Sequence, residues 1–228
     1  GSVSLWKSFP EVLAGKLKLP LLAYDRVGSG LSDAITQKRN KNFLKDQAFK
    51  YLPDLLKKLN LHQKNLILVG HSDGGSIALY YASRFKVKAV VSIAAHVMLE
   101  DYMIEGIDEV AKDFYDGELA QKLQKYHKEK TERLFKEWHE TWTSSWYSDW
   151  NMLKELKQIT QPVYVIQGEH DKNGSIEQVN QILKNINGSS KQTIIENCGH
   201  SPHIETPDIL VNLIYNFIND LNASRQSK

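Results

Sequence analysis

The chain has 228 residues, enough for one sizeable α/β domain with an inserted subdomain. Its 29 Lys and Arg residues against 27 Asp and Glu give a net charge of +2, which supports neither a nucleic-acid partner nor an anionic membrane partner. The single cysteine, Cys198, excludes an internal disulfide framework and favours a reducing, cytoplasmic location. No stretch has the apolar length of a membrane span.

The N-terminal part of the chain predicts a helix and then a strand. Apolar residues within 1–19 are spaced to cover one face of a helix, and Pro20 ends it. The run at 21–24 predicts a buried strand, and a polar, Gly-rich loop follows at 25–33. This loop is not a dinucleotide fingerprint, because Asp33 stands where the third glycine would be.

The stretch 65–75 predicts a strand followed by a sharp turn. Residues 65–70 form a short apolar run, and Gly70, Ser72 and Gly74 then form a G-x-S-x-G motif that leads into a helix ending near residue 85. We expect Ser72 to lie in strained geometry, and both glycines to be required because a Cβ at either position would collide with the neighbouring strand or helix. The backbone N–H of Asp73 would then point at a negative charge forming beside Ser72.

The sequence from 43 to 59 has a helical period, and Pro53 is expected to bend the helix or to mark a boundary within it. A buried strand is expected at 88–95, followed by a helical insertion at 97–160 without strands. This insertion contains Trp138, Trp142, Trp146 and Trp150, a spacing that would place them as a drifting stripe on one helix face. Two interpretations remain open: the rings attach the insertion to the main body, or they line an aromatic pocket above Ser72.

Alternation of strands and helices resumes after residue 160. Strands are expected at 161–167 and 192–196, and helices from Ser175, with Gln178 completing a capping box, and from Pro207, with a frayed tail at 223–228. The pattern predicts a mostly parallel sheet with helices on both faces. We therefore divide the chain into a first core part (1–96), the helical cap insertion (97–160) and a second core part (161–228).

Three residues follow predicted strands in an order typical of nucleophilic catalysis. Ser72, Asp171 and His200 each lie in a loop at the carboxyl end of a parallel strand, and these ends share one edge of the sheet. A serine hydroxyl needs a base within reach, and the imidazole needs a carboxylate to fix its tautomer. Competing candidates are His203 as the base and Glu169 as the acid, and we favour His200 and Asp171.

A metal site built on His200, His203 and Glu205 is disfavoured, because no second Cys or His cluster completes a ligand set. We expect no metal and no cofactor. His71 and His96 lie where they could border a pocket, and the expected pocket residues are His96, Trp138, Trp142 and Trp146.

The chain resembles members of the α/β-hydrolase superfamily, in particular the branch of capped esterases, lactonases and meta-cleavage-product hydrolases. Four motifs carry the resemblance: Tyr24-Asp25-Arg26-x-Gly28-x-Gly30-x-Ser32-Asp33, Gly70-His71-Ser72-Asp73-Gly74-Gly75, Gly168-Glu169-His170-Asp171 and Gly199-His200-Ser201-Pro202-His203. The resemblance implies that Ser72 is the nucleophile, Asp171 the orienting acid and His200 the general base. It also implies that the Asp73 amide donates to the oxyanion.

The expected function is hydrolysis of small, largely apolar carboxylic esters, with lactones or thioesters as related substrates. An alternative is carbon–carbon hydrolysis of a ring-cleavage product, for which Arg26 or Arg133 would have to bind a substrate carboxylate. A third possibility, from another class, is a ligand-binding protein that keeps the fold without turnover. The expected partner is a small acyl substrate, and neither nucleic acid nor a membrane is expected as a partner.

The resemblance also implies strands that precede this sequence. In the family, a third strand lies beside the one that ends in the nucleophile turn, and its loop supplies the second oxyanion amide. Without it, two rows of backbone donors and acceptors would lie unpaired in the middle of the sheet. We therefore expect the chain to be a fragment of a longer polypeptide, with its second oxyanion donor upstream of Gly1.

Overall fold

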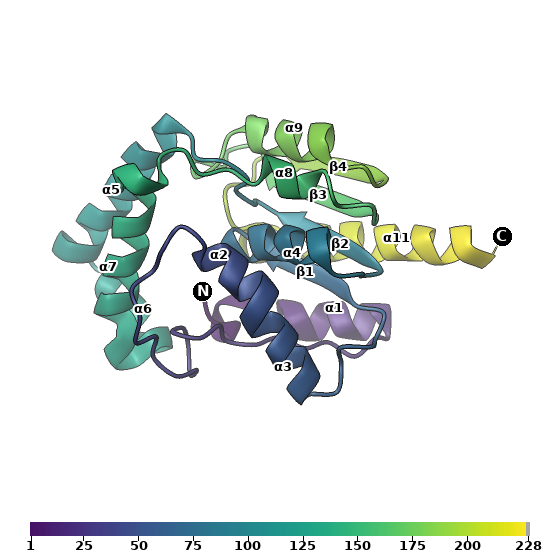
Figure 1. Cartoon of the computed structure of the whole chain (residues 1–228), viewed down its shortest axis with the longest axis horizontal. Helices are drawn as coiled ribbons and strands as arrows, with labels where there is room; N and C mark the ends of the chain where they lie inside the picture. The colour runs from purple at the N-terminus through teal and green to yellow at the C-terminus, as the bar shows by residue number, and fades with distance from the viewer. Residues whose placement is uncertain (227–228) are drawn as a thin grey trace.

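A computed structural model of the chain describes residues 1–226, and its centre is a four-stranded parallel sheet. The strands follow one another across the sheet in chain order, and β1 pairs with β2, β2 with β3 and β3 with β4. Figure 1 shows the sheet between its helices. The strands are β1 (Ile67–His71), β2 (Ala89–Ile93), β3 (Val163–Gly168) and β4 (Ser190–Ile195).

The two central strands are buried on both faces, which explains their uninterrupted apolar sequences. In β2, Ala89, Val91 and Ile93 pack on one face of the sheet, while Val90 packs on the other. The prediction of a parallel sheet covered by helices on both faces is confirmed.

Two helices cover the first face of the sheet and lie against each other: α1 (Phe9–Leu17) and α11 (Pro207–Gln226). A short turn of 3-10 helix, η1 (Val3–Trp6), precedes α1, and α10 (Pro202–Glu205) precedes α11. The predicted start of the last helix at Pro207 is confirmed, and proline suits this position because its missing N–H has no intrahelical partner there. The tail expected to fray at 223–228 is helical to Gln226, and its last two residues lie outside the described ones.

The second face is covered by helices from three parts of the chain (Figure 1). They are α2 (Phe43–Asp46), α3 (Leu52–Lys58), α4 (Asp73–Arg84), α8 (Leu153–Leu156) and α9 (Ile176–Asn185). A π-helical stretch, η2 (Gln47–Tyr51), joins α2 to α3, and Pro53 lies in the first turn of α3. Because proline has no N–H to donate, it interrupts the regular hydrogen-bond ladder, and the expected boundary within this helical sequence lies here.

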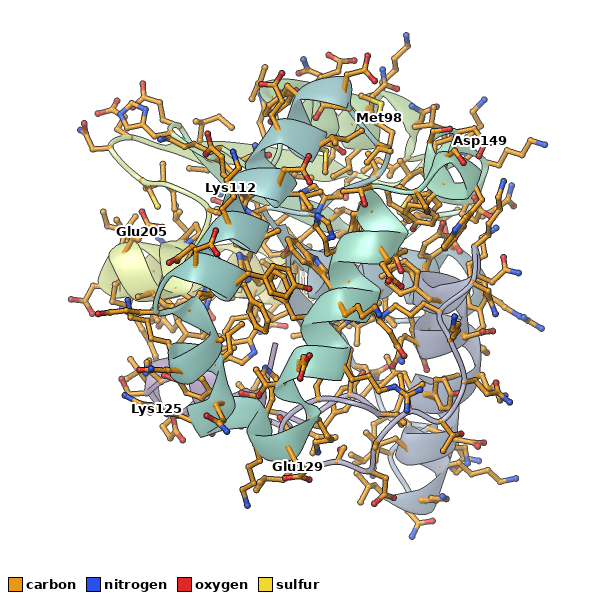
Figure 2. The ribbon with its side chains drawn as sticks, turned by 90° about the vertical axis from the view of Figure 1, so that its left-hand side faces the viewer. Met98, Lys112, Lys125, Glu129, Asp149 and Glu205 are labelled. Carbon is orange, nitrogen blue, oxygen red and sulfur yellow. The ribbon has the colours of Figure 1, made fainter. Side chains whose placement is uncertain are left out.

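Residues 97–160 form helices without a named strand. They are α5 (Asp101–Asp116), α6 (Leu119–His127), η3 (Lys128–Lys130), α7 (Thr131–Trp142), η4 (Ser145–Tyr147) and the short α8. Figure 2 shows α5 and α7 running side by side across one end of the molecule, joined near Glu129. We call residues 97–160 the helical segment.

The strand predicted at 21–24 is wrong. These residues have no regular secondary structure, and Leu21 and Leu22 are 41% and 46% exposed. A strand requires a hydrogen-bonded neighbour, and within residues 1–226 β1 pairs with β2 alone and lies at the edge of the sheet.

The capping box predicted at Ser175 is also wrong in part. The Ser175 hydroxyl does cap α9, but it accepts from the Glu177 N–H at 3.0 Å. The Gln178 side chain does not return to the helix start, because it bonds residues 97–100 instead: its carbonyl oxygen accepts from the Val97 N–H at 2.7 Å. Gln178 therefore ties α9 to the beginning of the helical segment.

No helix in the described part of the chain combines the length and the hydropathy that crossing a bilayer requires.

Candidate active site

The candidate nucleophile lies between β1 and α4, which are separated by one residue. Ser72 has φ 54° and ψ −126°, a combination that non-glycine residues rarely adopt and that marks local strain. Its N–H donates to the carbonyl of Ile93 at 2.9 Å and so fixes the turn to the end of β2. The turn leaves Ser72 on the wall of a cavity at the carboxyl edge of the sheet.

Close backbone packing explains only one of the two glycines of the motif. A Cβ on Gly70 would lie 2.1 Å from the carbonyl oxygen of Gly74, so this position admits no side chain. The same expectation for Gly74 is wrong, because a Cβ there would meet nothing within 4 Å. The close helix contact falls one residue later, where a Cβ on Gly75 would lie 2.7 Å from the Ala95 Cβ.

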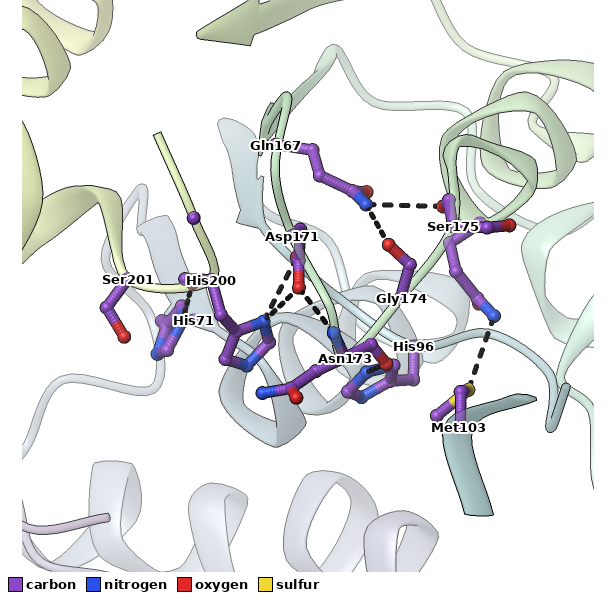
Figure 3. Close-up of polar contacts among 12 residues, drawn as sticks. His71, His96, Met103, Gln167, Asp171, Asn173, Gly174, Ser175, His200 and Ser201 are labelled. Atoms are coloured by element: carbon purple, nitrogen blue, oxygen red, sulfur yellow. Dashed lines mark hydrogen bonds and ion pairs between the residues drawn. The ribbon is translucent and has the colours of Figure 1, made fainter. Parts of the chain in front are cut away.

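The candidate acid and base come together in the loops that follow β3 and β4. The Nδ1–H of His200 donates to both carboxylate oxygens of Asp171, at 2.9 and 3.0 Å (Figure 3). The Asp171 side chain is 1% exposed, and the Asn173 N–H donates to the same carboxylate at 2.8 Å. This arrangement holds the His200 proton on Nδ1 and leaves Nε2 free to accept a proton.

Neither competing candidate has this geometry. His203 is buried, its Nδ1 has no hydrogen-bond partner, and burial lowers its pKa to about 4. The Glu169 carboxylate is half-exposed and accepts from the Asn197 N–H at 3.1 Å. Among the described residues, the acid–base contact is therefore made by Asp171 and His200.

A cavity of about 150 Å³ lies above Ser72. Its polar wall includes Ser72, His200 and His96, and the helical segment supplies the apolar wall. The other lining residues are Asp73, Asn173, Met103, Gly106, Ile107, Val110, Trp138 and Trp142.

Three of the four expected pocket residues line this cavity. His96 is 6% exposed, and its Nε2–H donates to the Asn173 carbonyl at 2.8 Å (Figure 3). Trp138 and Trp142 lie on α7 and form part of the apolar wall.

The expectation for Trp146 is wrong, because α7 ends at Trp142 and the four-residue spacing then no longer defines one face. Trp146 lies in η4, does not line the cavity and is 39% exposed. Trp150 is buried in the core and also lies away from the cavity wall.

Sequence reasoning missed the contribution of α5 to the cavity. Met103, Ile107 and Val110 are spaced by four and three residues, which places them on one face of the helix. This spacing is visible in the sequence, but it is equally typical of a helix face that packs against a core, so it does not single out cavity residues. Asn173 was missed as well, since a loop residue two positions after the acid carries no periodic signal.

Asp73 carries a largely buried charge beside the candidate nucleophile. Its carboxylate accepts from two nitrogens of Arg26, at 3.4 and 3.5 Å. Burial raises the pKa of Asp73, but the positive charges of Arg26 and Arg39 outweigh it, so the pKa is lowered from its ordinary value. The Asp73 N–H is the first of helix α4 and has no acceptor within the helix, as an oxyanion donor requires.

The helical segment is attached to the loop at 25–36 by polar contacts. The Gly30 N–H donates to Nδ1 of His127 at 2.9 Å. The Lys130 ammonium donates to the Ser32 carbonyl, and Arg133 donates to the Thr36 carbonyl at 3.1 Å. Because His127 accepts through Nδ1, its ring must be neutral, and burial lowers its pKa to about 4.

Sequence comparison identifies the family. The model of the alpha/beta hydrolase family matches residues 1–213, and the chain therefore belongs to this family. No match was found among the curated proteins.

Solved structures with the same fold include several hydrolases. The meta-cleavage product hydrolase CumD from Pseudomonas fluorescens IP01 is 19% identical with a TM-score of 0.72, over 93% of this chain and 85% of that one. The enol-lactonase from Burkholderia xenovorans LB400 is 17% identical with a TM-score of 0.69, over 96% and 87%. The proline iminopeptidase from Mycobacterium smegmatis is 15% identical with a TM-score of 0.71, over 97% and 87%. At these identities the likeness establishes the α/β-hydrolase fold.

The packing of the nucleophile turn predicts opposite results for its two glycines. Gly70→Ala should prevent native folding or remove most of the stability, because its Cβ would overlap a backbone carbonyl that cannot move independently. Gly74→Ala should keep the fold and is the matched control. Circular dichroism and thermal unfolding measure both, and a stable, native-like Gly70→Ala protein would contradict the account.

The contact between His127 and Gly30 predicts a pH dependence. The folded-state pKa of His127 is about 4, below the ordinary 6.5, so the unfolded state binds more protons between these values. The free energy of unfolding should therefore fall as pH is lowered through this window. His127→Asn keeps an acceptor near the Nδ1 position and cannot be protonated, so its stability should fall less steeply than that of the wild type.

Urea unfolding at several pH values between 7 and 4 measures this difference. His62→Asn is the control, because His62 is exposed. Equal slopes for wild type, His62→Asn and His127→Asn would show that His127 has no such effect.

Proposed function

We propose that this protein is a serine hydrolase that cleaves small, largely apolar carboxylic esters through Ser72, His200 and Asp171. Lactones and thioesters belong to the same reaction class, because each has an acyl carbonyl open to attack by a serine. Membership of the alpha/beta hydrolase family supports hydrolysis in general.

One observation carries the proposal: His200 donates to both oxygens of the buried Asp171 and shares a cavity with Ser72. The carboxylate fixes the tautomer with a free Nε2 and stabilises the imidazolium formed when that nitrogen takes a proton. We infer in addition that Ser72 Oγ donates a hydrogen bond to His200 Nε2, a kind of bond that tightens when substrate binds.

The reaction would proceed in two halves. Ser72 Oγ attacks the carbonyl carbon while His200 Nε2 takes its proton, and the Asp73 N–H donates to the oxyanion. His200 then gives the proton to the departing alcohol, which leaves the acyl group on Ser72. Water, deprotonated by His200, attacks the acyl-enzyme and releases the acid, and Ser72 recovers its proton.

The cavity limits the size and polarity of the acyl group. About 150 Å³ accommodates a group of roughly the size of benzene. The wall opposite the catalytic side chains is formed by aliphatic and aromatic residues of α5 and α7. A short aliphatic or a single aromatic acyl group therefore fits best.

Carbon–carbon hydrolysis is the alternative reaction, and it would require a cation for the substrate carboxylate. Arg133 is half-exposed and pairs with Glu137 at 2.9 Å, away from the cavity wall. Arg26 is engaged by Asp73, so a substrate carboxylate would have to compete with that ion pair. Both observations favour esters.

A ligand-binding protein without turnover is the alternative from another class. A burst of p-nitrophenol from p-nitrophenyl butyrate would argue for the enzyme, because acylation of Ser72 releases the phenol before hydrolysis. Binding of the ester without release would argue for the binding protein.

The triad predicts three inactive variants. Ser72→Ala should lower kcat for p-nitrophenyl butyrate by roughly 10⁴–10⁶-fold and abolish labelling by a fluorophosphonate probe. Asp171→Asn and His200→Ala should be similarly impaired, and the losses should not add in double variants, because the three residues act as a unit. Circular dichroism checks that each variant is folded, and wild-type turnover in Ser72→Ala would overturn the proposal.

The apolar wall predicts a change of acyl preference. Trp138→Ala enlarges the cavity and should raise kcat/KM for octanoyl esters relative to butanoyl esters by roughly 10-fold. Trp146→Ala, which removes a tryptophan outside the cavity, should leave this ratio unchanged. A panel of p-nitrophenyl esters measures the ratios, and equal shifts in both variants would contradict the assignment of the wall.

A further inference from the structure

His71 connects the backbone of the candidate nucleophile to the backbone of the candidate base. It is the last residue of β1 and directly precedes Ser72. Its side chain crosses to the loop after β4, where Nε2–H donates to the carbonyl oxygen of His200 at 2.7 Å (Figure 3). One side chain therefore spans the two loops whose separation determines how Ser72 and His200 meet.

The ring of His71 is enclosed by other rings. Its centroid lies 4.8 Å from that of His200, 4.6 Å from that of His203 and 6.3 Å from that of Trp6. Burial, and then the neighbouring His200 and His203, hold its pKa well below 6.5. At neutral pH the ring is uncharged, and the carbonyl acceptor keeps its proton on Nε2.

The other hydrogen bonds of the His200 loop are local or reach the loop after β3, where the His170 N–H donates to the Cys198 carbonyl at 2.8 Å. The N–H groups of Gly199 and Ser201 donate to the Glu205 carboxylate at 2.6 and 2.8 Å. Glu205 lies in α10, a few residues further along the same loop, so these bonds do not fix the distance to Ser72. Among the described residues, the bond from His71 is the hydrogen bond that attaches this loop to the end of β1.

We propose that His71 is a positioning residue, whose Nε2–H bond to the His200 carbonyl holds the base at its working distance from Ser72. This inference rests on the proposed serine-hydrolase function. It concerns a different property, namely the geometry of proton transfer rather than the identity of the nucleophile.

The position of the bond predicts a loss in kcat rather than in KM. A displacement of about 1 Å between reacting groups costs up to roughly 10²-fold in rate. His71 does not line the cavity, so substrate binding should change little when it is replaced. A residue with a purely structural role would lower the amount of folded protein without separating kcat from KM.

The experiment compares two replacements of similar length. In His71→Gln the side-chain amide donates from nearly the same position as Nε2, whereas His71→Met fills similar space without a donor. We expect His71→Met to lower kcat for p-nitrophenyl butyrate by roughly 10–100-fold with KM within about 3-fold. His71→Gln should retain kcat within about 3-fold.

His203→Met is the matched control. The His203 ring packs against the His71 ring, with centroids 4.6 Å apart, but it makes no hydrogen bond to His200 or Asp171 among the described contacts. It should keep kcat within about 3-fold. Thermal unfolding accompanies each measurement, and comparison is restricted to variants that are folded at the assay temperature.

The outcomes separate this inference from the proposed function. Full kcat in His71→Met, or equal losses in His71→Met and His71→Gln, would overturn the positioning role while leaving the triad intact. If the wild type neither turns over esters nor reacts with a fluorophosphonate, the proposed function fails, and crystal structures then decide the positioning role. Displacement of His200 from Ser72 in His71→Met, but not in His71→Gln, supports it, and an unmoved His200 overturns it.

Discussion

The site depends on the contact between the end of β1 and the start of α4. Strand and helix approach so closely that Gly70 has the Gly74 carbonyl where a side chain would be, and the single residue between them is forced to a positive φ. An isolated turn would relax from such geometry, because strain of this kind costs about 1–3 kcal/mol. The bond from Ser72 N–H to Ile93 and the packing of α4 against β1 and β2 hold it in place. Both the candidate nucleophile and the first free amide of the helix owe their positions to this contact.

The remaining catalytic candidates are brought to the turn by parallel strand order. β1, β2 and β3 end at the same edge, and β4 follows next to β3, so short loops suffice to place Asp171 against His200. Two parts of the chain form the candidate site: the sheet edge supplies its charged and hydroxyl groups, and α5 and α7 supply most of the apolar wall. His127, Lys130 and Arg133 attach α6, η3 and α7 to the loop at 25–36, and these contacts help to fix the position of the wall.

Features with a local cause could be predicted from the sequence. The strands 89–93 and 163–168 have apolar runs because they are buried on both faces, while the run at 67–71 is half-buried at the edge of the sheet. The loops after β1, β3 and β4 carry motifs in family order. Features with a distant cause could not. The run at 21–24 has strand composition, but a strand exists only where a neighbour pairs with it. The four-residue spacing that includes Trp146 loses its helical meaning where α7 ends at Trp142. The Gln178 side chain accepts from the Val97 N–H instead of bonding to the start of its own helix. The role of His71 was equally hidden, because its bond joins residues 129 positions apart.

The apolar character of the cavity wall has a consequence for discrimination between related molecules. The aliphatic side chains of this wall distinguish neighbouring members of a homologous series by only about 1–3 kcal/mol per methylene, since they offer contact or crowding but no directional bond. Sharper rejection requires a buried donor or acceptor that the wrong ligand leaves unpaired. Among the described residues of the wall, the Trp142 indole N–H is such a donor, because it is buried without a hydrogen-bond partner. Such a wall sorts molecules mainly by bulk, and Trp142 is the point at which it can also select for a polar acceptor.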